Sequence, residues 1–245
     1  MRSALTCSVT DAQALQRAVD LADEAGYAGL QLKQPQFALA DGLRLGKLSP
    51  AGVVVYPGAD YSMWDATIAG VTAFAERTGN RHVCLVFPAG AEGEGVDAVA
   101  LRLNELGARL REDSFELSVH NHRNSIIESL DQLLRLRDRL DPGACGITFD
   151  TAHAYLGGIG DLAAAYRSLS SHVTNVHVKD LDASGRFVPL GRGVLGAAIP
   201  PLIRALGVTG YEGWIVVDDE SDLSEFSLDQ IVVEQLRYLE RAGVR

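Results

Sequence analysis

The sequence predicts an α/β fold in which a single (β/α)8 barrel, the TIM-barrel architecture, spans residues 1–245 as one domain. Three observations support this expectation. Eight short apolar runs rich in β-branched residues recur along the chain, and segments with helical spacing separate most of them. A chain of 245 residues with 47% hydrophobic content has the usual size of such a barrel. Polar residues, finally, gather on one face at the ends of the last four runs.

The apolar runs are expected to be strands, and the intervening segments to be the crossover helices of a parallel sheet. The expected strands are residues 4–8, 28–32, 53–56, 83–87, 115–120, 147–150, 173–178 and 214–217. The expected helices are residues 11–25, 64–77, 96–111, 126–140, 162–169, 199–206 and 228–242. Only residues 34–50 lack a convincing helix, because Pro35, Gly42 and Pro50 favour a loop or a short helical stub.

Residues two apart on a strand point to the same face, which provides a test of the barrel in its second half. One parity is mostly polar, and its members are Ser118, His120, His122, Thr148, Asp150, Asn175, His177, Lys179, Val216, Asp218 and Glu220. The other parity is apolar, and its members are Leu117, Val119, Ile147, Phe149, Val176, Val178, Ile215 and Val217. A sheet buried on both faces would be apolar on both parities. The polar set therefore predicts a site in the mouth of a barrel, although the first four strands show the pattern far less.

Composition argues against several classes of partner. Twenty-two Lys and Arg against 32 Asp and Glu give a net charge of −10, which opposes binding to the phosphate backbone of nucleic acids. No apolar stretch is long enough to span a bilayer, so no membrane partner is expected. The cysteines Cys7, Cys84 and Cys145 lie in apolar runs without the spacing of a disulfide framework or a zinc motif. A cytoplasmic protein is expected, and homo-oligomerisation stays open.

The ends of the last four expected strands carry histidines and acidic residues. The strings are HNH at 120–122, DTAH at 150–153, HVKD at 177–180 and DDE at 218–220. Strand ends converge in a barrel, and burying several titratable groups together is unfavourable unless they are paired or bind a metal. We therefore expect a divalent ion with His120, Asp150, His177 and Asp218 as ligands. Two imidazoles and two carboxylates suit Mn²⁺, Co²⁺ or Zn²⁺, and Mg²⁺ also fits.

Further polar residues follow the same strand ends. Lys179 is placed to stabilise negative charge on an enolised substrate, or else to form a salt bridge with Asp180 or Glu220. The candidates for substrate binding are His153, in the glycine-rich loop expected after Asp150, together with Arg192 and Glu220.

Residues 191–196 read Gly-Arg-Gly-Val-Leu-Gly, a formal GxGxxG pattern that occurs in dinucleotide-binding folds. Such a site needs a central strand before the glycines and a helix after them. Residues 186–190 contain Pro189 and are too short for a central strand, and the following segment carries Pro200 and Pro201. The glycines are therefore expected to shape a loop.

Four strings between Phe115 and Glu220 point to a known family: LSVHNH, ITFDTAHAYLGG, TNVHVKDLDASGRFVPLGRG and GYEGWIVVDDE. They resemble the xylose isomerase-like barrel superfamily, which includes sugar isomerases and epimerases, inosose dehydratases and endonuclease IV. In that family a Glu, an Asp, a His and a second Glu from four successive strands bind the metal, and the two glutamates often exchange protons with substrate. Asp150 and His177 match this pattern. His120 and Asp218 stand where the family has glutamates, so the resemblance gives Asp218 a catalytic role as well as a ligating one.

The resemblance also bears on His122, which matches a histidine that related dehydratases place beside the substrate. This match implies that His122 transfers protons. The alternative is that the His122 ring only orients a metal ligand.

The expected centre and the resemblance together imply a metal-dependent isomerase or epimerase that moves a proton through an enediolate of a small sugar or keto-polyol. If the same enolate expels a β-hydroxyl group, the enzyme is instead a dehydratase of an inosose or a related keto-polyol. Because both glutamate positions are altered, a non-catalytic carbohydrate-binding barrel or partner subunit is a third interpretation. An endonuclease-like phosphoesterase would need more metal ligands and a basic groove, which the net charge of −10 argues against.

Overall fold

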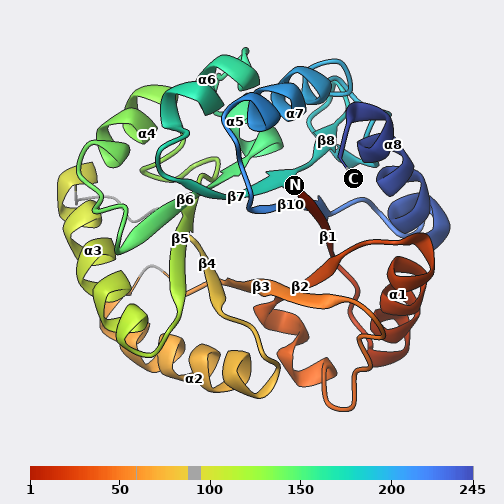
Figure 1. The fold of residues 1–245 in the computed structure, drawn as a ribbon, viewed down its shortest axis with the longest axis horizontal. Helices are drawn as coiled ribbons and strands as arrows, with labels where there is room; N and C mark the ends of the chain where they lie inside the picture. Colours follow the sequence, from red (N-terminus) through yellow and green to blue (C-terminus); the bar gives the residue numbers. More distant parts are fainter. Residues whose placement is uncertain (59, 88–94, 245) are drawn as a thin grey trace.

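A computed structural model describes residues 1–58, 60–87 and 95–244, and it shows a closed barrel of parallel strands surrounded by helices (Figure 1). The barrel strands are β1 (Arg2–Cys7), β2 (Gly29–Lys33), β3 (Ser49–Val55), β4 (His82–Val86), β5 (Glu116–His120), β6 (Cys145–Asp150), β7 (Val173–Val178) and β10 (Trp214–Asp219). Each pairs in parallel with its neighbours, and β1 closes the barrel by pairing with both β2 and β10. The predicted fold class is confirmed.

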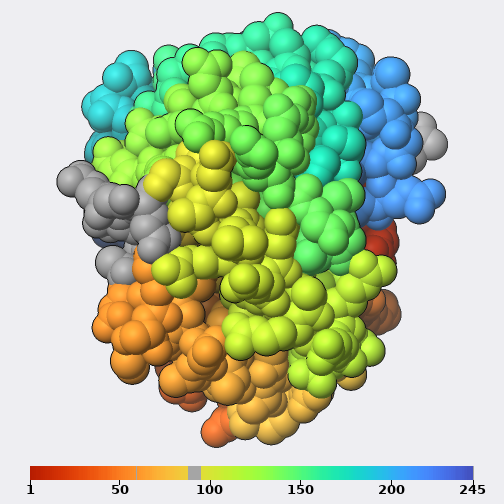
Figure 2. Space-filling model, turned by 90° about the vertical axis from the view of Figure 1, so that its left-hand side faces the viewer, coloured from red at the N-terminus to blue at the C-terminus, as the bar shows by residue number. Residues whose placement is uncertain are grey.

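The helices outside the barrel are α1 (Ala12–Ala25), α2 (Trp64–Arg77), α3 (Val96–Glu112), α4 (Leu130–Arg137), α5 (Thr151–Leu156), α6 (Leu162–Leu169), α7 (Ile199–Val208) and α8 (Gln235–Ala242). Figure 2 shows one side of this layer, where α2 in orange, α3 in yellow to light green and α4 in green follow one another. The helix expected over residues 126–140 is shorter than predicted, because Ser129 caps the start of α4 by accepting a hydrogen bond from the backbone of Gln132. The last expected helix opens with a π-helical turn, η3 (Gln230–Glu234).

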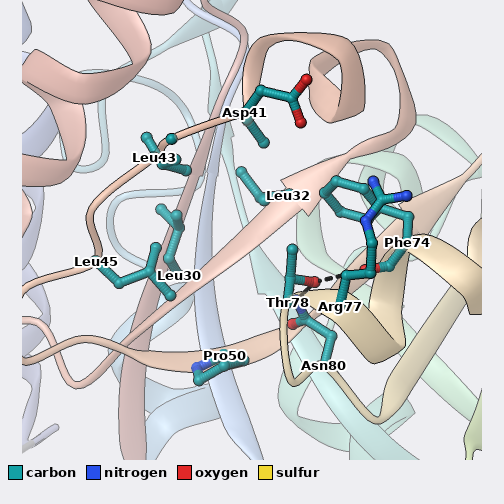
Figure 3. A pocket seen from close by; sticks show the side chains of 12 residues that line it. Leu30, Leu32, Asp41, Leu43, Leu45, Pro50, Phe74, Arg77, Thr78 and Asn80 are labelled. Atoms are coloured by element: carbon teal, nitrogen blue, oxygen red, sulfur yellow. Dashed lines mark hydrogen bonds between the residues drawn. The ribbon is translucent and has the colours of Figure 1, made fainter.

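The connection between β2 and β3 lacks a full crossover helix, as predicted, and contains the 3₁₀ segment η1 (Gln34–Leu39). The ring of Phe37 in this segment stacks on Phe74 of α2 at a centroid distance of 3.9 Å. A pocket of about 360 Å³ with a mixed polar and apolar lining lies beside this connection (Figure 3). Its lining includes Leu30, Leu32, Leu43, Leu45, Phe74 and Arg77.

The prediction that polar and apolar side chains lie on opposite faces of the last four strands is confirmed. The apolar parity of the last four strands lies in one continuous core cluster with the covering helices. The polar parity points into the barrel, where polar side chains continue below the mouth. There Nε2 of His82 lies 2.8 Å from Oγ of Ser118, which in turn lies 2.6 Å from Oγ1 of Thr148. Part of the interior of the second half of the barrel is therefore hydrogen-bonded, whereas the buried amide of Asn175 on β7 forms no hydrogen bond within the described residues.

Two further expectations concern the chain as a whole. The three cysteines are buried and free, as predicted. Within the described ranges 1–58, 60–87 and 95–244, no helix is both long and apolar enough to cross a membrane.

Candidate metal centre

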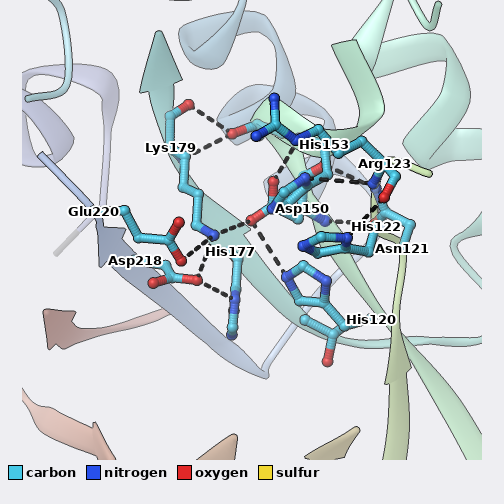
Figure 4. Close-up of polar contacts among 12 residues, drawn as sticks. His120, Asn121, His122, Arg123, Asp150, His153, His177, Lys179, Asp218 and Glu220 are labelled. Carbon is cyan, nitrogen blue, oxygen red and sulfur yellow. Dashed lines mark hydrogen bonds and ion pairs between the residues drawn. The ribbon is translucent and has the colours of Figure 1, made fainter. Parts of the chain in front are cut away.

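Four side chains from adjacent strands meet at the carboxyl end of the barrel (Figure 4). His120 is the last residue of β5 and Asp150 the last residue of β6. His177 and Asp218 are the penultimate residues of β7 and β10. Asp150 is in register with His177, which is in register with Val216 of β10. One donor atom from each of the four residues lies within 4.8 Å of the other three. The barrel thus brings together the four residues that the sequence analysis selected.

The donor set of these four residues fits a divalent ion. All four are at most 4% exposed. Two of their buried atoms, His120 Nδ1 and His177 Nε2, form no hydrogen bond within the described part of the chain. Asp150 Oδ2 and Asp218 Oδ1 likewise lack a hydrogen bond there, but each lies in an ion pair with a lysine. Buried polar atoms are normally hydrogen-bonded, and two imidazole nitrogens with two carboxylate oxygens are typical ligands of transition metals. The cluster could therefore hold such an ion.

Hydrogen bonds beyond the strand ends hold these ligands in position. The amide of buried Asn121 accepts from the backbone N–H of Asp150 at 2.7 Å and donates to its carbonyl oxygen at 3.1 Å. The hydroxyl of Thr151 makes the same pair of bonds with the backbone of Lys179, both at 2.8 Å. Each side chain extends the pairing between two strands where the backbone ladder stops. This fixes the backbone from which Asp150, His177 and Lys179 project.

Asp150 also caps a short helix that the sequence analysis did not expect. Its Oδ1 accepts from the backbone N–H of His153 at 2.8 Å, which starts α5 directly after β6. His153 therefore lies in a helix and not in the predicted glycine-rich loop. Because Oδ1 is engaged by the cap, Oδ2 is the oxygen of Asp150 that remains for the centre.

Two lysines face the carboxylates of the cluster. Nζ of Lys179 lies 2.9 Å from Asp218 Oδ2, 3.1 Å from Glu220 Oε1 and 3.5 Å from Asp150 Oδ2. Nζ of Lys33 lies 2.8 Å from Asp218 Oδ1 and 3.0 Å from Glu220 Oε1. Of the two salt bridges considered for Lys179, the one with Glu220 forms. Both lysine side chains are at most 7% exposed, so these ion pairs lie in a nearly dry environment.

These contacts control the charge states of the cluster. Burial alone would raise the pKa of Asp150, but the nearby Lys179 and His153 hold that pKa far below its ordinary value. Burial alone would likewise lower the pKa of Lys179, whereas Asp150, Asp218 and Glu220 raise it well above its ordinary value. Burial lowers the pKa of His177, partly opposed by its hydrogen bond to Asp218. The carboxylates and lysines of the cluster are therefore charged, and the imidazole of His177 beside them is neutral.

The rings of the other two histidines of the mouth are in contact and tilted by 33° to each other. The rings of His122 and His153 have centroids 4.0 Å apart, and the ring of His120 lies 6.1 and 5.5 Å from them. His153 is buried, whereas His122 is partly exposed. Burial is the main cause that lowers the pKa of both rings, to about 2 for His153. His122 is therefore a neutral imidazole open to the mouth of the barrel.

Arg192 points away from the cluster in the contacts that the structure shows. Its guanidinium lies 2.8 Å from Glu234 and packs near the ring of Phe226, at 44% exposure of the side chain. A role of Arg192 in substrate binding therefore stays a prediction without a supporting contact.

The GxGxxG segment wraps around a carboxylate of the protein itself. Buried Asp180 accepts hydrogen bonds from the backbone N–H groups of Gly191, Gly193 and Leu195 at 2.9 to 3.0 Å. A side chain at position 193 would collide with the Asp180 carboxylate and the carbonyl oxygen of Leu181. The glycines thus shape a loop, as predicted.

Lys33 is the residue of the cluster that the sequence analysis missed. It is the last residue of β2 and points to the same face as Gly29 and Gln31. This strand contains no histidine and no acidic residue. The sequence contains one indication of this role, because Lys33 directly follows the apolar run of an expected strand. Nothing in the local sequence indicates that its ammonium group reaches Asp218, because the two residues are 185 positions apart and meet only when the barrel closes.

Comparison with known proteins places this barrel in a family. A family model described as "Xylose isomerase-like TIM barrel" matches residues 66–242. The chain belongs to this family. The resemblance drawn from the strings in the second half of the sequence is therefore confirmed.

The curated relatives of this family member include inosose dehydratases. An inosose dehydratase of Lacticaseibacillus casei is 24% identical over 162 residues, which cover 59% of this chain and 53% of that protein. The chain spans about half the length of the curated relatives it matches.

Several solved structures share the fold over nearly the whole chain. The probable 3-DHS dehydratase AsbF of Bacillus anthracis superposes with a TM-score of 0.79 at 14% identity, over 98% of this chain and 99% of its own. A D-psicose 3-epimerase of Clostridium cellulolyticum H10 gives 0.77 at 14% identity, with full coverage of both chains. The IOLI protein, solved with a bound zinc atom, gives 0.75 at 11% identity, over 99% and 98% of the two chains. At these identities the likeness shows the fold alone.

Proposed function

We propose that His120, Asp150, His177 and Asp218 bind one divalent ion, and that the protein dehydrates a keto-polyol of the inosose type. The inosose dehydratases among its relatives favour this lyase reaction over the isomerisation or epimerisation that the sequence analysis put first. When bound, the ion would polarise the carbonyl group of the substrate and so make the neighbouring C–H bond more acidic. The remaining steps fall to side chains of the protein.

The observation that carries the proposal is the contact between the rings of His122 and His153 beside the cluster. The neutral, partly exposed imidazole of His122 is suited to accept the proton from the carbon next to the carbonyl group. His153, 4.0 Å away and buried, orients that ring and excludes water from its inner face. These positions support the proposal that His122 carries the proton and that His153 orients its ring.

One side chain that carries a proton is sufficient for the elimination. The C–H proton moves to His122, the C–H electron pair forms the new C=C bond, and the β-hydroxyl group leaves. The imidazolium of His122 returns its proton to that leaving group, so the substrate loses one water and the protein regains its starting state. Lys179, whose ammonium group lies among Asp150, Asp218 and Glu220, stabilises the negative charge that builds up on the substrate oxygen.

Epimerisation is the second candidate, and Glu220 is the residue that favours it. An epimerase must return the proton to the opposite face of the carbon, and Glu220 lies on the other side of the cluster from His122 in Figure 4, with 29% of its side chain exposed. Burial alone would raise the pKa of Glu220, but Lys179 and Lys33 hold it below its ordinary value. This makes Glu220 a weak base, which is why dehydration ranks first.

The deciding experiment follows solvent deuterium exchange and water loss by NMR in D₂O, with Mn²⁺-loaded protein and a panel of inososes, D-psicose and D-tagatose. Exchange at the α-carbon together with water loss supports dehydration, and exchange with interconversion of two sugars supports epimerisation. The variant His122→Gln should reduce either rate by ~10²-fold or more, whereas His172→Gln, at a histidine outside the centre, should not. No exchange with any ligand that binds would reject the enzyme in favour of a carbohydrate-binding barrel.

A further inference from the structure

Lys33 is a second buried ammonium group on one wall of the candidate metal centre. Besides Asp218 and Glu220, its Nζ reaches the hydroxyl oxygen of Ser8 at 3.0 Å, so β1 and β2 both contribute to this wall. It approaches Asp218 from the Oδ1 side, while Lys179 and His177 hold the Oδ2 side. Burying an ammonium group is unfavourable even when it is paired, so its place beside a site calls for a role.

The charges in contact with the cluster show what Lys33 changes. The carboxylates of Asp150, Asp218 and Glu220 face the ammonium groups of Lys33 and Lys179, which leaves one negative charge in excess. Imidazoles that bind a metal are neutral, so a divalent ion would turn this into one positive charge in excess. With a neutral residue in place of Lys33, the loaded centre would carry no net charge.

We propose that Lys33 gives the metal-loaded centre its excess positive charge, and that this charge favours a chelating monoanion, such as the enolate form of a carbonyl substrate, over the neutral substrate. This inference rests on the proposed function for the identity of the anion. A neutral keto-polyol gains little from the extra charge until its C–H proton leaves, so Lys33 stabilises the transition state more than the ground state. The same charge repels the metal and lowers its affinity.

Replacing Lys33 leaves the ligand set in position. Asp218 has a hydrogen bond to His177 at 3.0 Å and an ion pair with Lys179, and neither contact involves Lys33. Lys33→Met removes the charge at similar volume, and Lys33→Arg preserves it. Lys47, which is exposed, provides Lys47→Met as a matched control.

The test measures binding and requires no turnover. Mn²⁺ is titrated calorimetrically into each variant, and the loaded proteins are then titrated with glycolate, a chelating monoanion, and with dihydroxyacetone, a neutral hydroxy-ketone. We expect Lys33→Met to bind Mn²⁺ ~10-fold more tightly and glycolate ~10-fold more weakly than the unmodified protein, with dihydroxyacetone unchanged. Lys33→Arg and Lys47→Met should behave like the unmodified protein.

These opposite changes separate a charge effect from a structural one. If Lys33→Met binds Mn²⁺ equally or less tightly, or keeps its affinity for glycolate, the inference is wrong. If Lys33→Met does not fold, as judged by circular dichroism, the comparison of Lys33→Gln with Lys33→Arg replaces it with the same criteria. An unmodified protein that binds no Mn²⁺ would overturn both this inference and the proposed function. Absence of deuterium exchange with normal Mn²⁺ and glycolate binding would overturn the proposed function alone.

Discussion

Nδ1 of His177 lies 3.0 Å from Oδ2 of Asp218, and this contact orients the ring so that Nε2 is the nitrogen without a hydrogen bond in the described structure. A carboxylate that accepts from one imidazole nitrogen is the common way in which proteins orient the other nitrogen toward a metal. In this barrel the carboxylate comes from the neighbouring strand and is itself a candidate ligand. The centre is therefore a network in which loss of one member should disturb the others.

The first prediction concerns metal binding. Replacing Asp150 or His177 with Ala should reduce the affinity for Mn²⁺ by more than ~100-fold, because each substitution removes a proposed ligand. Calorimetric titration and the metal content of the purified variants measure the effect. His172→Ala, at a histidine outside the cluster, is the control and should bind as the unmodified protein does. Unchanged binding by both Asp150→Ala and His177→Ala would disprove the assigned ligands.

The second prediction concerns the loop around Asp180. Gly193→Ala should lower the free energy of unfolding by ~2–3 kcal/mol, because the new methyl group meets the Asp180 carboxylate and a backbone carbonyl oxygen. Gly160→Ala is the matched control, since a Cβ atom there has no neighbour within 4 Å. Urea denaturation followed by circular dichroism compares the two variants. Equal stabilities would show that the loop does not need to approach Asp180 so closely.

The third prediction uses two glycines inside helices. Gly107 of α3 packs against the backbone of Ala144, whereas Gly70 of α2 has open space around it. Gly107→Ala should therefore destabilise the fold by ~1–3 kcal/mol through overpacking. Gly70→Ala should stabilise it by ~0.5–1 kcal/mol, because alanine favours a helix over glycine. Thermal unfolding of both variants measures the difference, and a shift of the same sign in both would contradict the packing of α3 on β6.

The fourth prediction concerns pH. Burial lowers the pKa of His82 from its ordinary value of 6.5 to about 4, with His177 as the second cause. The folded state then binds fewer protons than the unfolded state between these values, so the free energy of unfolding decreases as the pH falls from about 6.5 to about 4. Because the ring is only partly buried, we expect His82 to contribute ~1–2 kcal/mol of this decrease.

The variant His82→Gln tests this assignment, because the amide of glutamine extends about as far as Nε2 of histidine and can hydrogen-bond to Ser118, but does not titrate in this range. Urea denaturation at pH 7, 5.5 and 4.5 should show a smaller loss of stability in the variant than in the unmodified protein. The lowered pKa values of other buried histidines, such as His153, account for the slope that remains. A parallel pH dependence in the two proteins would show that His82 is not a source of it.

Much of the fold was predictable because its signals are local. Alternating apolar runs and helical segments predict the barrel, and side-chain parity in the sequence separates Leu117 and Val119 from Ser118 and His120. Helix ends were predicted less well. Asp150 starts α5 and Ser129 shortens α4 through side-chain hydrogen bonds, which periodicity does not detect.

The sequence by itself determined four strand ends that carry His120, Asp150, His177 and Asp218, because neighbouring strands of a barrel must bring their carboxyl ends together. Only the tertiary structure showed that Lys33 joins them, that Arg192 pairs with Glu234, and that the GxGxxG loop binds Asp180. Each of these contacts joins distant parts of the chain or depends on how a loop folds back. Periodicity and strand parity describe one element at a time. The ion pairs between distant strands form only when the barrel closes by pairing of β1 with β10.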